Sequence, residues 1–241
     1  MRQIPHGDES GVSSARSSFF PQGTLGGRIR VLQTMDYPEA DEVIRRITEL
    51  AQSTMPLVVA IDGHSGTGKS TLAACIARVV GATVVDQDDF YSGGSLEDWR
   101  ALTVSGKVDR VIDWRRVRTQ VLEPLRAGKM ASWHPFDWES MAGLAAQTIS
   151  VSPSPIVILD GAYSSRRELA DLVDLSILVV LPEDERRKRL LIREGEVYVD
   201  AWQSVWDDAE ALYFGTLRPP DLFDIVIERP IDDSTSITDI R

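Results

Sequence analysis

Residues 63–70 of the chain form a glycine-rich loop with the spacing G-x-x-x-x-G-K-[ST]. A continuous apolar run, Leu57–Ile61, leads into the loop, and a helical pattern begins at Ser70 and stops at Gly81. Successive backbone amides in such a loop, together with the positive end of the following helix, bind phosphate groups. A strand, a loop and a helix in this order therefore predict an α/β fold with a phosphate site. A chance glycine-rich turn is the alternative.

The polar residues of the loop have separate expected roles in binding a nucleoside triphosphate. Lys69 is expected to reach the β- and γ-phosphates, and Ser70 is expected to place its hydroxyl on Mg²⁺. ATP is the expected donor, with GTP as the alternative. His64 has no expected catalytic role. The residues expected to contact the cofactor are Gly63, His64, Ser65, Gly66, Thr67, Gly68, Lys69, Ser70 and Thr71.

Further apolar segments have the length of buried strands, and helical patterns lie between most of them. This alternation predicts a three-layer α/β/α fold with a five-stranded parallel sheet. A helix is expected before the first strand, with Asp36 and Glu39 as a capping pair. A later helix is expected to pack Trp202 and Trp206 into a core. The expected strands are Leu57–Ile61, Thr83–Asp86, Ile156–Asp160, Leu175–Leu181 and Ile225–Ile227.

Acidic residues follow two of the expected strands. The segment Asp86–Tyr91 follows the second strand along the chain, and Asp160 ends the third. Ligands of open parallel sheets bind at the carboxyl ends of the strands, so both are expected to lie near the glycine-rich loop. A carboxylate there can accept a hydroxyl proton during phosphoryl transfer, and Asp160 fits the position of a Walker-B-type acid. A helix cap or solvated loop is the alternative for the first segment, and a turn is the alternative for Asp160.

Several segments together resemble the uridine kinase branch of the P-loop kinases, over most of residues 57–227. The resemblance implies a P-loop kinase fold with a helical lid that uses ATP and Mg²⁺ to phosphorylate a small molecule. It implies Asp88 as the catalytic base, Tyr91 as a contact to the nucleoside and Asp160 as a support for Mg²⁺. The segments that carry it are the loop at 63–70, Gln87–Tyr91, Val121–Gly128, Phe136–Trp138 and Leu159–Gly161.

A basic segment, Glu185–Arg193, follows an expected strand and Pro182, and is interpreted as a helix. The resemblance implies that it carries lid arginines, whose planar, permanently charged side chains can span phosphate oxygens. Arg193 aligns best and Arg189 comes next. Leu190 stands where the family commonly has another arginine. A solvated basic helix face is the alternative interpretation.

The acceptor site is the least defined part of the resemblance. The family usually has the segment Asp-His-Pro-x-x-Phe-Asp, whereas this chain has Asp109–Trp114, which is shorter and lacks the His-Pro pair. Asp109 can accept hydrogen bonds from a ribose diol, or it is a surface residue. His134 and Phe136 lie where related kinases contact the base, and an aromatic ring suits a flat heterocycle. With Tyr91, these residues form the expected substrate site.

Composition limits the partners and the compartment. The formal net charge of −11 repels nucleic acid and anionic membranes, so neither is an expected partner. No apolar run approaches the roughly 20 residues that cross a bilayer, and no signal peptide is recognisable. The single cysteine excludes an intrachain disulfide, and a cytoplasmic protein is expected. Residues 1–35 are interpreted as a flexible tail, and residues 36–241 as a single P-loop kinase domain.

The sequence thus predicts an ATP-dependent phosphotransferase that moves the γ-phosphate in line to a hydroxyl of a uridine- or cytidine-like nucleoside. The same chemistry on another small alcohol, such as a sugar, a vitamin precursor or an antibiotic, is the alternative. A regulatory ATP-binding module is a third interpretation. A GTPase switch is excluded, because its Asn-Lys-x-Asp motif needs an asparagine and the chain has none. Whether the protein forms a homo-oligomer is left open.

Overall fold

The computed structural model of the protein describes residues 38–194 and 204–229. The chain divides into two units, Met1–Met35 and Asp36–Arg241, and the first unit lies outside the described residues. The expected flexible tail therefore lies outside this description. So does the expected capping pair, because neither Asp36 nor the side chain of Glu39 is described.

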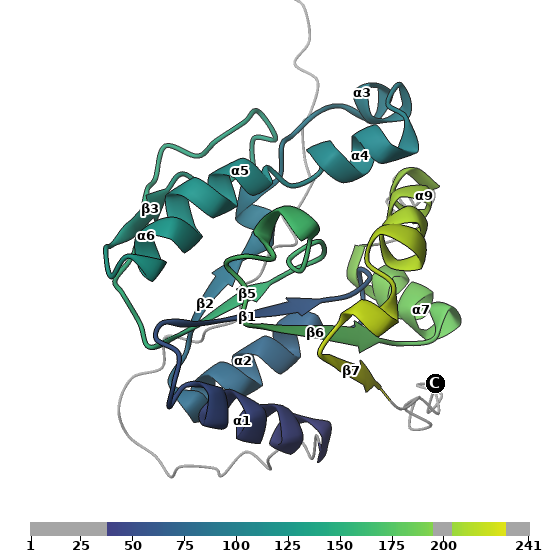
Figure 1. Ribbon diagram of the computed structural model, residues 1–241. Coiled ribbons are helices and arrows are strands. Elements are labelled where there is room, and N and C mark those ends of the chain that lie inside the picture. Colours follow the sequence, from purple (N-terminus) through teal and green to yellow (C-terminus); the bar gives the residue numbers. More distant parts are fainter. Residues whose placement is uncertain (1–37, 195–203, 230–241) are drawn as a thin grey trace, which may run out of the picture. The chain divides into compact units, whose positions relative to one another are not determined.

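A five-stranded parallel sheet with the order β2-β5-β1-β6-β7 forms the centre of the second unit (Figure 1). Each expected strand is present, with ends that differ by at most one residue from the predicted ones. Parallel neighbours need crossover connections, and helices supply most of them. The predicted α/β class and parallel sheet are therefore confirmed. The strands are β1 (Leu57–Asp62), β2 (Thr83–Asp86), β5 (Ile156–Asp160), β6 (Leu175–Val180) and β7 (Ile225–Glu228).

Helices of very different length surround the sheet. They are α1 (Pro38–Leu50), α2 (Lys69–Val80), α3 (Leu96–Arg100), α4 (Val104–Arg110), α5 (Trp114–Arg116), α6 (Glu123–Arg126), α7 (Glu183–Glu194) and α9 (Ser204–Leu212). Single 3₁₀ turns occupy Gln87–Phe90, Arg167–Leu169 and Pro220–Leu222, and wider π-type turns occupy Val117–Leu122 and Tyr213–Leu217. No helix in the described part of the chain is long and apolar enough to cross a membrane.

Both faces of the sheet are buried, which explains the continuous apolar runs of its strands. Alternate side chains of a strand point to opposite faces. Leu57, Val59 and Ile61 of β1 pack with α1 and α2 in one core, whereas Val58 belongs to a second core on the other face. Figure 1 shows α1 and α2 on one side of the sheet and α4 to α6 on the other. The predicted three-layer arrangement is confirmed.

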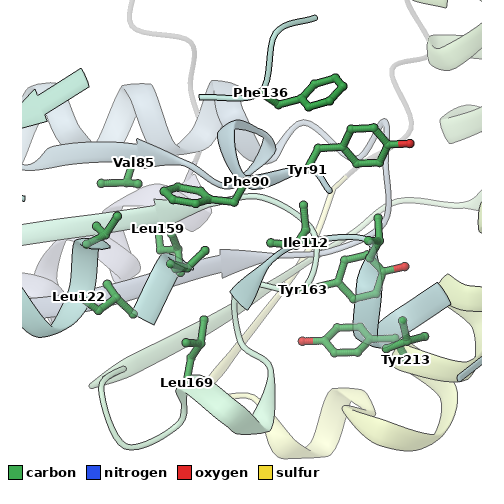
Figure 2. Close-up of a cluster of buried hydrophobic side chains, with 14 of the residues drawn as sticks. Val85, Phe90, Tyr91, Ile112, Leu122, Phe136, Leu159, Tyr163, Leu169 and Tyr213 are labelled. Carbon is green, nitrogen blue, oxygen red and sulfur yellow. The ribbon is translucent and has the colours of Figure 1, made fainter. Parts of the chain in front are cut away.

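The two cores differ in composition. The core under α1 and α2 is aliphatic throughout its described members, whereas the second core collects aromatic side chains such as Phe90, Tyr163 and Tyr213 (Figure 2). Trp206 of α9 is partly buried against this second core, as predicted, and Trp202 lies outside the described residues. The aromatic residues thus gather on the face of the sheet that also carries the acidic turn after β2.

A short antiparallel pair was not predicted. It consists of β3 (Ala131–Trp133) and β4 (Ile149–Val151). Each strand has three residues, which is too short for an alternating pattern to stand out from the background. The pair nevertheless supports the candidate site, because the Trp133 indole donates a hydrogen bond to Asp89 in the acidic turn at 2.9 Å.

Candidate active site

The glycine-rich loop runs from the carboxyl end of β1 into the first turn of α2. Gly63, Gly66 and Gly68 have φ angles of 145°, 84° and 90°, which glycine adopts without strain. No side chain caps the amino end of α2. No described residue accepts a hydrogen bond from the backbone N–H groups of Gly66, Gly68 or Lys69. Because the first amides of a helix lack partners within it, these groups are available to a phosphate.

Lys69 folds back onto the loop in this structure. Its side chain is buried, and Nζ donates a hydrogen bond to the backbone oxygen of His64 at 2.9 Å. The Thr67 hydroxyl donates to the same oxygen at 2.9 Å. The predicted contact of Lys69 with the β- and γ-phosphates therefore requires Nζ to share or leave this carbonyl when a nucleotide binds.

Ser70 and Asp160, the predicted Mg²⁺ residues, lie together. Asp160 is 5% exposed and accepts a hydrogen bond from Ser70, while its Oδ1 has no partner among the described residues. Burial, together with the negative charge of Asp88, raises the pKa of Asp160 to about 6, and the Ser70 hydrogen bond and the Lys69 charge offset only part of this. A buried carboxylate with an unpaired oxygen beside a hydroxyl suits a hard cation such as Mg²⁺.

The acidic turn Gln87–Phe90 begins where Asp86, the last residue of β2, lies opposite Asp160 in the next strand. Asp86 accepts a hydrogen bond from the backbone N–H of Asp88 at 2.9 Å and so caps the turn. Asp86 is an exposed residue, but partial desolvation of its carboxyl group, followed by the negative charge of Asp88, raises its pKa to about 7. The capping role considered for this segment therefore belongs to Asp86. Asp88 is exposed, so an acceptor molecule can reach it.

Tyr91 and Phe136, two of the predicted substrate residues, lie side by side. The Phe136 backbone N–H donates to the backbone oxygen of Asp89 at 2.7 Å, and Tyr91 forms a β-bridge with Ile112. The centre of the Tyr91 ring lies 4.9 Å from that of Phe136 and 5.0 Å from that of Trp138. Both Tyr91 and Phe136 are buried. We use the term aromatic cluster for Tyr91, Trp99, Phe136, Trp138 and Trp206.

Asp109 and His134, the other predicted substrate residues, have different partners. The Asp109 side chain is 58% exposed and accepts a hydrogen bond from the Trp114 indole at 3.3 Å. His134 is exposed, with Nδ1 3.0 Å from the Ala145 backbone oxygen and Nε2 3.4 Å from the Thr148 hydroxyl. Asp109 also pairs with Arg166, whose Nη2 lies 3.7 Å from its Oδ1. None of these contacts links Asp109 or His134 to the aromatic cluster.

Helix α7 carries the predicted lid arginines along the loop. Arg189 Nη1 lies 3.6 Å from the position that a Cβ atom would take on Gly68, and Arg193 is exposed at the end of the helix. Leu190 is buried, and its Cγ lies 3.0 Å from the position of a Cβ on Gly66. At the place where the resembling family commonly has an arginine, this chain therefore packs an apolar side chain directly against the loop.

Asp62, which the sequence did not single out, anchors the start of the loop. It is fully buried at the end of β1 and accepts hydrogen bonds from the N–H groups of Gly63, Tyr163 and Ser165 at 2.8, 2.8 and 2.9 Å. The Tyr213 hydroxyl adds a fourth at 2.9 Å. Burial raises the pKa of Asp62, and the hydrogen bonds oppose it. The signal in the sequence that could have identified Asp62 is its position, as an acidic residue at the end of a buried apolar run.

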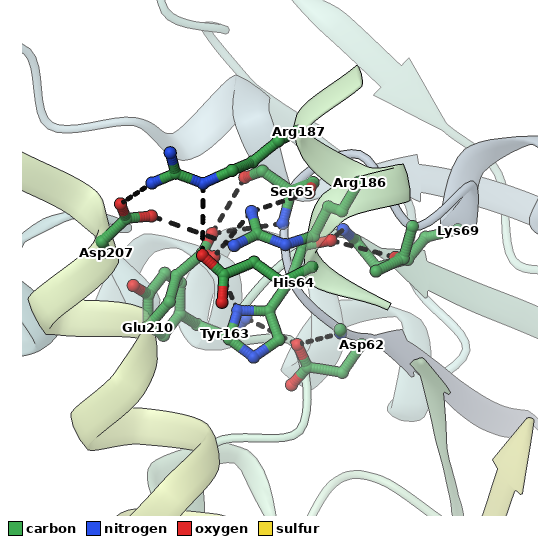
Figure 3. A network of polar contacts seen from close by, with 12 residues as sticks. Asp62, His64, Ser65, Lys69, Tyr163, Arg186, Arg187, Asp207 and Glu210 are labelled. Atoms are coloured by element: carbon green, nitrogen blue, oxygen red, sulfur yellow. Dashed lines mark hydrogen bonds and ion pairs between the residues drawn. The ribbon is translucent and has the colours of Figure 1, made fainter. Parts of the chain in front are cut away.

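Arg186 of α7 and Glu210 of α9 are two further residues that the sequence did not identify (Figure 3). Arg186 donates to the Ser65 backbone oxygen at 3.2 Å, and the Glu210 carboxylate lies 2.7 Å from His64 Nδ1. The His64 ring also packs on Phe214, with 4.3 Å between ring centres. Nothing in the sequence separates these two residues from the other charged residues of their helices. His64, for which no catalytic role was expected, has structural contacts.

Comparisons with known proteins give sequence relatives of two kinds. No family model matches the chain. A uridine kinase from Deinococcus deserti is 28% identical over 146 residues, which cover 58% of this chain and 70% of the relative. Inorganic pyrophosphatase TTM2 from Arabidopsis thaliana is 30% identical over 140 residues, which cover 57% of this chain and 20% of that protein. The chain thus spans about a fifth of TTM2. Other bacterial uridine kinases match at 24 to 28% identity.

Among solved structures, a candidate fructose transport system kinase from Silicibacter sp. TM1040 aligns with a TM-score of 0.62. The alignment covers 78% of this chain and 98% of that chain, at 22% identity. At this identity the structural similarity establishes a shared fold only. The evidence of an evolutionary relationship comes from the sequence relatives.

The loop geometry predicts that Gly63→Ala is strongly destabilising. Gly63 has a φ of 145°, and an added Cβ would fall well inside van der Waals contact with the backbone oxygen of Val179 in β6, which cannot move aside. We expect a loss of at least about 3 kcal/mol in the free energy of unfolding, measured in urea. Gly81→Ala is the matched control, since Gly81 also has a positive φ but open space around it. It should lose about 1 kcal/mol. Equal losses in the two variants would rule out the clash.

The raised pKa of Asp160 predicts a pH-dependent loss of stability in the absence of Mg²⁺. Its carboxyl group has an ordinary pKa of 3.8 and a folded pKa of about 6, so the folded protein binds this proton more tightly. Stability is therefore lost as the pH rises from about 4 to about 6. Asp160→Asn should be about 3 kcal/mol more stable than the wild type at pH 7 in urea unfolding, with a difference that shrinks toward pH 4. A difference that stays the same across this range would contradict the assignment.

Proposed function

We propose that this uridine kinase-like P-loop kinase transfers the γ-phosphate of ATP to a hydroxyl group of a nucleoside of the uridine or cytidine kind. Sequence relatives named uridine kinases support the kinase chemistry. Their identity to this chain is low enough that the acceptor has to be argued from the site itself.

Phosphoryl transfer is supported by the groups that lie at the carboxyl ends of β1, β5 and β2. These strands are neighbours, so the glycine-rich loop, Asp160 and the acidic turn follow one another along one edge of the sheet. Asp88 is near enough to Asp160 to contribute to its raised pKa. This meeting of a phosphate loop with an accessible carboxylate is the observation that carries the proposal, because phosphoryl transfer depends mainly on positioning and electrostatics.

In the proposed reaction Asp88 orients the acceptor hydroxyl and takes its proton as the oxygen attacks the γ-phosphorus. The bond from the γ-phosphorus to the bridging oxygen breaks, and ADP leaves. The transition state is loose and the proton moves late, so an ordinary carboxylate is a sufficient base. Lys69, Arg189 and Arg193 are the cations proposed to stabilise the charge that moves toward the leaving oxygen.

The metal site also fits the proposal. The unpaired, buried Oδ1 of Asp160 and the neighbouring Ser70 hydroxyl are oxygen ligands of the kind that Mg²⁺ prefers. When bound there, Mg²⁺ would neutralise part of the negative charge of the phosphates. Its positive charge would also favour the charged form of Asp160, whose pKa is raised by burial first and by the neighbouring carboxylates second.

A nucleoside acceptor is favoured by the aromatic cluster that follows the base in sequence. Tyr91 comes three residues after Asp88, and Phe136 is tied to the same turn through its backbone. Trp138 and Trp206 are only partly buried, so the cluster keeps aromatic surface that is open to a ligand. Stacking against such rings suits a flat heterocycle.

Another small alcohol is the second candidate acceptor, and specific contacts favour it. Asp109 and His134, the residues that resemble a nucleoside site, already have Trp114, Ala145 and Thr148 as partners. The comparison with a candidate fructose transport system kinase adds a sugar to the acceptor classes worth testing. A vitamin precursor or an antibiotic alcohol fits the same chemistry.

A panel assay separates the two candidates. The purified full chain is incubated with Mg-ATP and separate pools of nucleosides, sugars and vitamin or antibiotic alcohols, and the products are analysed for an added phosphate by mass spectrometry. Phosphorylation of uridine or cytidine supports the main proposal, and phosphorylation of another alcohol supports the second. ATP hydrolysis without any phosphorylated acceptor would contradict both.

With the acceptor in hand, Asp88→Asn should lower kcat by about 10² to 10⁴ while leaving the Kd for Mg-ATP unchanged, because only the proton acceptor is removed. Asp89→Asn is the matched control in the same turn, since its amide oxygen can still accept the hydrogen bond from Trp133. Kinetics and calorimetry measure the two quantities. Near-normal turnover in Asp88→Asn would remove this residue from the base role.

A further inference from the structure

Four charged or polar side chains outside the reacting groups form one connected set, which we call the loop clamp: His64, Ser65, Arg186 and Glu210 (Figure 3). Glu210 Oε1 accepts hydrogen bonds from the Ser65 backbone N–H at 3.2 Å and from its hydroxyl at 2.9 Å. Glu210 Oε2 lies 2.7 Å from His64 Nδ1 and 3.7 Å from Arg186 Nη1. Arg186 also donates to the Ser65 backbone oxygen at 3.2 Å. All three polar groups of Ser65 are thereby held.

The clamp buries an ion pair at the foot of the loop. Glu210 is 4% exposed and Arg186 is 7% exposed. Burial opposes the charge of Glu210, but the hydrogen bond and attraction of His64, followed by the charge of Arg186, outweigh it and lower the pKa of Glu210. A buried ion pair adds little net stability compared with apolar residues of the same size. The main effect of this ion pair is therefore to fix the position of Ser65.

The clamp divides the loop into two halves. Glu210 uses the N–H group of Ser65, whereas the N–H groups of Gly66, Gly68 and Lys69 have no acceptor among the described residues. The negative charge of a carboxylate close to a phosphate site repels the phosphates and by itself weakens their binding. A carboxylate that also orders the loop can offset this repulsion. Fixing one half of the loop reduces the ordering that the other half undergoes when a phosphate binds.

The same contacts set the position of helix α7. Arg186 ties α7 to Ser65, and Leu190, one turn further along α7, packs against Gly66. Arg189 lies between them in sequence, with its guanidinium near Gly68. The distance of Arg189 from the phosphate half of the loop therefore depends on the clamp.

We infer that Glu210 is a positioning residue of the nucleotide site: it holds the His64–Ser65 half of the loop and, through Arg186, helix α7, so that the amides from Gly66 onward are preorganised for the phosphates of ATP. The inference rests on the proposed nucleotide role of the loop and is independent of the acceptor. It assigns Glu210 no contact with the reacting atoms.

Glu210→Gln tests the inference, because positioning and simple electrostatics predict opposite results. Removing a negative charge next to Arg186 should tighten Mg-ATP binding if Glu210 acts only as a nearby charge. If Glu210 positions the loop, the Kd for Mg-ATP should rise about tenfold. Both carboxylate oxygens of Glu210 are used, one by Ser65 and one by His64, and an amide keeps only one acceptor oxygen. Glu210→Ala should raise the Kd further. Calorimetry on the full chain measures the Kd. Asp208→Asn, an exposed acid on the same helix, is the control and should leave the Kd unchanged.

Folding is checked for every variant by near-ultraviolet circular dichroism and thermal unfolding. Ser65→Ala removes only the hydroxyl donor and keeps both buried charges, so it remains informative if Glu210→Ala does not fold; we expect a Kd about threefold higher. Folded Glu210→Gln that binds Mg-ATP as well as the wild type, or more tightly, would overturn the inference. A wild-type protein that binds no Mg-nucleotide would instead overturn the proposed function, and the inference with it.

Discussion

A single buried carboxylate, Asp62, joins the central sheet to three parts of the candidate active site. Its donors are Gly63 at the start of the loop, Tyr163 and Ser165 in the segment after β5, and Tyr213 in the turn after α9. Leaving any one of these buried donors unpaired would cost about 1 to 3 kcal/mol. The loop, the segment after Asp160 and helix α9 therefore have one common reference point, and the positions of Lys69, Asp160 and Glu210 follow from it.

The acidic edge of the sheet is the electrostatically unfavourable part of this arrangement. Asp86 and Asp160 lie opposite each other in adjacent strands, Asp88 follows one turn later, and the pKa values of the first two are raised. Like charges held this close destabilise the ligand-free fold and are relieved by a cation. The aliphatic core under α1 and α2 and the aromatic core on the other face supply the stability that offsets this repulsion.

The sequence predicted the features that depend on neighbouring residues. Strands buried on both faces leave continuous apolar runs, so all five sheet strands were recognised, whereas the three-residue strands β3 and β4 left no pattern. The acidic segment with Asp88 was found because it follows a strand, and Asp160 because it ends one, whereas the choice of Asp88 as the base came from the resemblance. Arg186 and Glu210 were missed because their contacts join two helices to the loop over more than 100 residues of sequence. His134 was expected from the resemblance alone, and its side chain contacts Ala145 and Thr148 rather than the aromatic cluster.

The proposed activity depends on the backbone amides of residues 63–71 binding the phosphates of a nucleoside triphosphate. Hydrogen–deuterium exchange on the full chain, with and without Mg-ATP, measures these amides directly. Mg-ATP should slow exchange in peptides that cover residues 63–71, with smaller protection in α7. Saturating Mg-ATP that leaves this segment unprotected, or that protects only segments remote from β1, β2 and β5, would contradict the proposed activity.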